Sequence, residues 1–72
     1  ENNMFYVTDA VTKNRVAISP IHVVAVFKIP EVDAQGNKSE MAGYTGINLI
    51  NGSIVCEEDD YAVVAEVNNS KA

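Results

Sequence analysis

The sequence has little of the chemistry that small domains and enzymes commonly use. It contains one cysteine and one histidine among 72 residues. A single cysteine cannot form an internal disulfide, and without a cluster of histidines and cysteines there is no zinc site. A chain of this length lies close to the size below which one hydrophobic core rarely suffices for stability. We therefore expect a homo-oligomer, in which a second chain contributes further apolar burial.

Long apolar runs are also absent from the sequence. No stretch reaches the length of about 18 apolar residues that a transmembrane helix requires. No basic segment leads into an apolar one, as it would in a signal peptide. We expect a cytoplasmic protein without membrane contact. Residues 1–3 precede Met4, and the sequence leaves open whether they are native or a remnant in front of the natural start.

Basic residues are scarce, with five lysines and arginines against ten acidic residues and a net charge of −5. Such a chain repels phosphate backbones, so we expect no direct binding to nucleic acid. The charge has two interpretations, which are solubility and an acidic surface that binds a basic partner protein. That partner could be one whose usual ligand is nucleic acid. The acids of this candidate surface are Glu57, Glu58, Asp59 and Asp60.

Signatures of catalysis and of cofactor binding are missing as well. There is no glycine-rich phosphate loop and no Ser/His/Asp arrangement. His22 has no assignable nucleophile beside it, and Cys56 is followed by acids that would raise the pKa of a thiol. The acidic run lacks the spaced oxygens and the glycine of a calcium loop. We therefore expect no enzyme, no cofactor and no bound metal.

The strongest structural signal is a hairpin within residues 44–58. Asn51 and Gly52 both tolerate positive φ, which favours a two-residue type I′ turn at these positions. Counting outward from that turn sets Leu49 opposite Ile54. The alternation then predicts which side chains of the hairpin point inward, namely Ile47, Leu49, Ile54 and Cys56.

Other segments favour strands through their aromatic and β-branched residues. The predicted strands lie at residues 4–8, 15–18 and 23–29, with a corner at Ser19-Pro20-Ile21-His22. We predict a mainly β fold, a small five-stranded antiparallel sheet or barrel with a short C-terminal helix. A single domain covers residues 4–67, and residues 1–3 and 68–72 are expected to be flexible ends.

The strand at 23–29 is expected to pair with residues 39–50 across a polar loop at 33–38. An odd loop length would place Phe27 opposite Thr45 and Ala25 opposite Ile47, which would join Val23, Ala25, Phe27 and Ile29 to the inward set. The opposite sheet face is then unusually apolar and must be covered by the N-terminal hairpin, by the helix or by another copy of the chain. Its residues form a candidate interface, namely Val24, Val26, Tyr44 and Val55.

Residues 59–67 fit both helical spacing and strict alternation. The acids at the start of this segment suit the positive end of a helix dipole, and its alanines favour a helix. The polar residues that begin at Asn68 would end it. We predict a helix here, with a strand as the alternative.

Several residues carry a resemblance to known families. The chain has an Ile-Ser-Pro-Ile-His-Val-Val corner, an Ile-x-Leu-x-Asn-Gly hairpin, and then Ile54, Glu58, Val63 and Val67. Over residues 15–67 this order resembles the small flagellar FlbD-like proteins and the C-terminal half of LytTR-type DNA-binding domains. The chain departs from both in its long insertion at 33–42, and it lacks the basic residues that a LytTR-like domain would use on DNA.

The sequence therefore predicts a non-enzymatic, acidic accessory protein that binds another protein or associates with itself. Its size and acidity suit a phage or mobile-element protein, such as a virion component or an inhibitor of a host factor. The alternative is a regulatory domain of the LytTR-like or FlbD-like kind.

Overall fold

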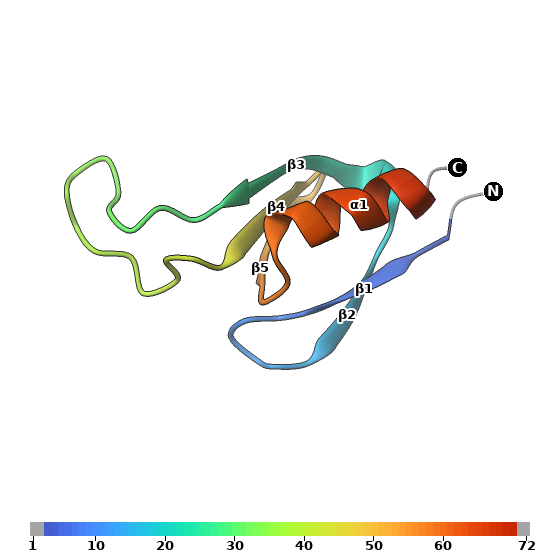
Figure 1. The fold of residues 1–72 in the computed structure, drawn as a ribbon, viewed down its shortest axis with the longest axis horizontal. Helices are drawn as coiled ribbons and strands as arrows, with labels where there is room; N and C mark the ends of the chain where they lie inside the picture. The colour runs from blue at the N-terminus through green and yellow to red at the C-terminus, as the bar shows by residue number, and fades with distance from the viewer. Residues whose placement is uncertain (1–2, 71–72) are drawn as a thin grey trace.

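The computed structural model describes residues 3–70. It shows five antiparallel strands in two sheets and one C-terminal α-helix, which confirms the predicted mainly β fold (Figure 1). The elements in chain order are β1 (Phe5–Thr8), β2 (Arg15–Ile18), the 3₁₀ turn η1 (Pro20–His22), β3 (Val23–Lys28), β4 (Thr45–Leu49), β5 (Gly52–Cys56) and α1 (Asp60–Ser70).

The two sheets are a hairpin of β1 with β2 and a three-stranded sheet in the order β3-β4-β5. They are joined where the end of β1 meets the end of β5. The Glu57 N–H donates to the Thr8 carbonyl and the Ala10 N–H donates to the Val55 carbonyl, both at 2.9 Å. Helix α1 packs against β1, η1 and β3. The strands thus form a partly closed barrel, and the helix covers one of its open sides.

The core lies between the two sheets and the helix. In the β1–β2 hairpin, Val7 pairs with Val16 and Phe5 pairs with Ile18, so alternate residues of both strands face inward. Burial of one large apolar side chain contributes on the order of 1.5–3 kcal/mol. The buried cluster consists of Phe5, Val7, Ile18, Ile47, Cys56, Val63 and Val67.

The β4–β5 turn lies one residue earlier than predicted. Leu49 pairs with Gly52, so Ile50 and Asn51 form the turn, and Ile47 rather than Leu49 lies opposite Ile54. The Ile50 N–H donates to the His22 carbonyl at 3.1 Å, which holds the turn against the corner before β3. Asn51 does not have the positive φ that a type I′ turn requires at this position. The register moves by two residues, so the predicted inward set of this hairpin still faces the core.

The predicted register of β3 is wrong beyond its first residue. Val23 lies opposite Leu49 as expected, but a bulge follows, after which Val26 pairs with Ile47 and Phe27 pairs with Gly46. The physical reason lies in the space above Gly46. A Cβ built on Gly46 would lie 2.5 Å from the Phe27 ring, so only glycine leaves room for this ring on the outer face. Val26 therefore packs against the core, while Ala25 and Phe27 are exposed.

Between β3 and β4 the chain forms a long arm that projects from the body of the molecule, at the left of Figure 1. The predicted loop is its tip, where Val32 bridges Lys38. The Asp33 carboxylate stabilises the tip by accepting the N–H groups of Gln35 and Asn37, each at 2.9 Å. The molecule is elongated as a result, with extents of 43 × 22 × 22 Å.

Helix α1 confirms the helical interpretation of residues 59–67, although it extends through Ser70. Asp59 caps it, because its side chain accepts the Tyr61 N–H at 3.1 Å and its carbonyl accepts the Val63 N–H. The inward Val63 and Val67 are one turn apart and are buried. Residues 68–70 thus belong to the helix rather than to a separate tail, whereas residues 1–2 and 71–72 lie outside the described residues.

The contact between Phe27 and Gly46 leads to a testable prediction. Gly46→Ala should lower the free energy of unfolding by about 1–2 kcal/mol, since the new methyl group forces the ring to move. Phe27→Ala removes the obstacle, so Gly46→Ala should cost less in that background. Urea unfolding of the four proteins of this double-mutant cycle measures the coupling. Equal costs in both backgrounds would contradict the proposed packing.

Candidate functional site

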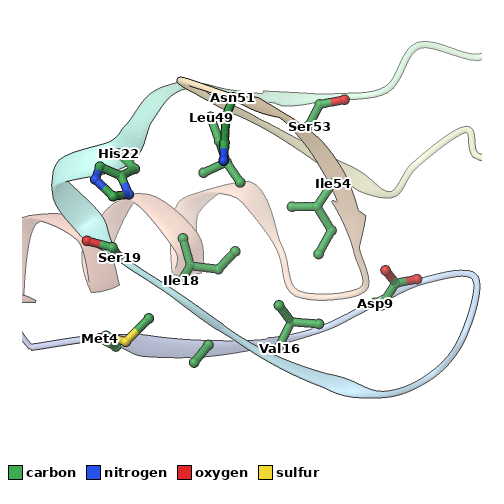
Figure 2. A pocket seen from close by; sticks show the side chains of 11 residues that line it. Met4, Asp9, Val16, Ile18, Ser19, His22, Leu49, Asn51, Ser53 and Ile54 are labelled. Carbon is green, nitrogen blue, oxygen red and sulfur yellow. The ribbon is translucent and has the colours of Figure 1, made fainter.

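An open cleft of about 610 Å³ lies between the β1–β2 hairpin and the tip of the β4–β5 hairpin. It lies on the side of the barrel where β2 faces the β4–β5 tip. The walls of this cleft consist of apolar side chains that adjoin the core. Figure 2 shows side chains from β2, β4 and β5 that converge on this space, with α1 behind them. These apolar residues are Met4, Val16, Ile18, Leu49 and Ile54.

The cleft runs along the free edge of β2. Val16 and Ile18 face inward, while Ala17 between them faces the outer side of the hairpin, yet all three border the cleft. β2 pairs with β1 on one side, and no strand within residues 3–70 pairs with its other side. Unpaired backbone groups therefore lie next to an apolar hollow. We call this combination the β2 edge cleft.

Polar side chains form the rim of the β2 edge cleft. His22 is exposed there, and Ser19 and Asp9 lie on the same rim. The Asp9 carboxylate accepts the N–H groups of Val11 and Thr12 in the β1–β2 turn, at 2.8 and 3.0 Å. No hydrogen bond connects the side chains of Ser19, His22 and Asp9 in the described part of the chain. The rim therefore shows no arrangement in which a base activates a nucleophile.

The four residues of the predicted interface do not share one face. Val26 faces the core, contrary to the prediction, because the bulge in β3 shifts it by one position. Val24 is the residue at the bulge and is 66% exposed. Tyr44 and Val55 are half-buried, and the Lys13 ammonium lies 5.9 Å from the centroid of the Tyr44 ring. Only Val24 is thus a freely exposed apolar side chain of this set.

The four acids of the predicted partner surface all take part in contacts within the chain. Glu57 forms an ion pair with Lys13, and the Glu58 side chain accepts the Thr8 N–H at 2.8 Å. The carboxylates of Asp59 and Asp60 lie 2.9 and 3.5 Å from the Lys28 ammonium. These contacts tie the start of α1 to both sheets. Binding of a basic partner by these acids stays a prediction.

Cys56 is fully buried at the end of β5, as its predicted inward position requires. Burial raises the pKa of its thiol to about 11, and the neighbouring Glu58 adds to this rise. The thiol lies 3.9 Å from the Glu58 carbonyl as a weak donor. A protonated, enclosed thiol of this kind serves packing rather than nucleophilic chemistry.

Sequence reasoning identified two of the five apolar residues that line the cleft. Leu49 and Ile54 were expected to point inward, and they do. Val16 and Ile18 alternate in a predicted strand, so an inward face of β2 was readable from the pattern. Nothing in the pattern shows that this face stays partly uncovered, because that depends on the angle between the two hairpins.

Neither a metal-binding cluster nor a membrane-spanning helix occurs among residues 3–70. No group of three or more histidines, cysteines or acids lies close enough together there to hold a metal ion. The single α-helix found among these residues is too short and too polar to cross a membrane.

Comparisons with known proteins add no assignment. No family model, no curated protein and no solved structure matches this chain.

The ion pair at the start of α1 predicts a pH dependence of stability. The hydrogen bond from Lys28, followed by that from the Tyr61 N–H, lowers the pKa of Asp59 below its usual value of 3.8. A lowered native pKa means that the unfolded chain binds the proton first. The stabilisation is therefore present above the unfolded pKa and is lost as pH falls through the native pKa, from about pH 5 downward.

Lys28→Met should remove part of this acid sensitivity. Urea unfolding at stepped pH between about 5 and 2 measures it. Lys38→Met is the matched control, since Lys38 is exposed on the arm and forms none of the ion pairs found among residues 3–70. The prediction is wrong if both variants lose stability with pH as steeply as the parent.

The burial of Cys56 predicts slow chemistry at its thiol. Iodoacetamide should label native protein at neutral pH far more slowly than protein in denaturant, because the thiol is enclosed and its pKa is raised. Mass spectrometry of the alkylated fraction over time checks this. A native rate equal to that of the denatured chain would show that Cys56 is accessible.

Proposed function

We propose that this chain is a non-enzymatic protein-binding domain that acts through the β2 edge cleft. The observation that supports this function best is the combination of a free strand edge with an adjacent apolar hollow. An extended polypeptide that joins a sheet edge gains main-chain hydrogen bonds, and its alternate side chains enter pockets beside the edge. The β2 edge cleft offers both contacts at one place.

The lining of the cleft suits an added strand. Its apolar wall comes from β2 on one side and from the β4–β5 tip on the other, so side chains from a strand beside β2 would cover Leu49 and Ile54. Such a strand would continue the β1–β2 hairpin as a three-stranded sheet. It would also cover apolar surface in a small domain whose core is partly open.

The charge distribution supports a protein ligand more than a nucleic acid. Lys13 and Lys28 are held in ion pairs, and the Arg15 guanidinium lies 4.9 Å from the centroid of the Tyr6 ring. Phosphate binding would have to break these contacts in a chain of net charge −5. No observation in the structure favours the LytTR-like alternative.

A selection of random peptides against the dilute protein tests the proposal. We expect enriched peptides with alternating apolar residues, which bind in extended form. Amide chemical shifts in NMR spectra should change mainly at residues 15–19 and 49–54. Ala17→Pro should abolish binding, because proline removes an outward N–H from an edge strand, where proline is otherwise tolerated.

Ala34→Pro is the matched control. Ala34 is the second residue of the turn that Asp33 and Gly36 close with a 3.0 Å hydrogen bond, a position that favours proline. This variant should bind the peptides like the parent. Peptides that bind Ala17→Pro equally well, or that shift amides elsewhere, would overturn the proposal.

A further inference from the structure

We propose that the β2 edge cleft is occupied by β2 of a second copy of this chain, in an antiparallel pair whose twofold axis passes through Ala17. This inference rests on the proposed function, because it names the polypeptide that fills the same surface. It depends on three properties of the described residues, which are the direction of the backbone groups of β2, the self-complementarity of its sequence and the protection of the edge of β3.

The hydrogen bonds of the first hairpin show which backbone groups of β2 are free. The Asp9 N–H donates to the Asn14 carbonyl at 2.8 Å, so Asn14 directs its carbonyl toward β1. In an antiparallel ladder successive residues direct their backbone groups to opposite sides. Val16 and Ile18 therefore bond to β1, and Arg15 and Ala17 direct their N–H and C=O groups toward the free edge.

A pair of β2 strands centred on Ala17 uses these free groups. Ala17 of one copy exchanges hydrogen bonds with Ala17 of the other, and Arg15 lies opposite Ser19. On the inward face Val16 lies opposite Ile18 at both ends of the pair, so apolar side chains meet apolar ones. Centring the pair on Val16 instead would place Ile18 opposite the polar Asn14. The sequence of β2 is thus complementary to itself in the register centred on Ala17.

The same pairing covers the cleft in both copies. Val16 and Ile18 of each copy would continue the inward face of the neighbouring hairpin, beside the half-buried Leu49 and Ile54. A twofold axis makes the two contacts identical, as in most homodimers. The outward side chain at the axis is a small alanine, which is exposed in the single chain and leaves room for the two copies to approach.

The free edge of β3 is protected against such pairing. β3 carries a bulge between Val23 and Ala25, and Pro30 follows the strand closely. Lys28 at its end is held by the acids at the start of α1, and α1 packs against this strand. Bulges, lysine, proline and a covering helix are the usual means by which proteins prevent edge pairing. The register of β2 shows no bulge, and the strand contains no proline.

Charge substitutions at the axis test the register directly. Ala17→Lys and Ala17→Glu each place two like charges opposite one another across the axis, and each should weaken dimerisation by up to about fivefold. Mixing the two variants should restore it, because lysine then lies opposite glutamate. Sedimentation equilibrium measures the dimer dissociation constants, and native mass spectrometry of the mixture measures the fraction of heterodimer.

We expect heterodimer above the statistical share in the mixture and unchanged melting curves for dilute variants, since the Ala17 side chain is exposed. Ala25→Lys, the same change on the edge strand β3, should leave dimerisation as in the parent. A parent that stays monomeric at high micromolar concentration would overturn the inference, as would a statistical mixture or dissociation by Ala25→Lys. A monomer whose β2 edge cleft still binds selected peptides would keep the proposed function and reject self-pairing alone.

Discussion

The architecture depends on the junction where β1 meets the end of β5. Two backbone hydrogen bonds join the strands there, and Glu58 reinforces the junction with its side chain and with its carbonyl group. Its side chain accepts the Thr8 N–H, while its carbonyl accepts the buried Thr45 hydroxyl at 2.5 Å. A buried hydroxyl without a partner would be costly, so this contact also fixes the start of α1 over the core. Apart from the junction, no backbone hydrogen bond among residues 3–70 links a strand of one sheet to a strand of the other.

The junction also explains why the protein has an open side. Because β1 reaches β5 only at one end, the two hairpins diverge from this point toward the β4–β5 tip. Helix α1 fills the space on one side, with Val63 and Val67 against the strands. On the opposite side no element of residues 3–70 fills it, and the β2 edge cleft results. The proposed binding surface is therefore a consequence of how the barrel closes.

The acidic run shows how local charge can have a structural role. Four consecutive acids would repel one another. Three of them, however, lie beside a lysine ammonium group, and Glu58 accepts the Thr8 N–H. Asp59 combines a helix cap with an ion pair to Lys28, and both contacts favour its ionised form. A run of charge that suggests a partner surface thus holds the helix on the sheets.

The sequence by itself determined the strands, the corner, the helix and the inward residues of the second hairpin. These follow from local patterns, since alternation decides which face of a strand is apolar and the cap residue decides where a helix begins. It did not determine the register of β3, because the fit of Phe27 over Gly46 arises only when the strands are side by side. The turn at Ile50 likewise depended on a hydrogen bond to His22, which is distant in sequence. The β2 edge cleft was decided by the tertiary structure alone, because the angle between two hairpins is set by contacts that no local pattern records.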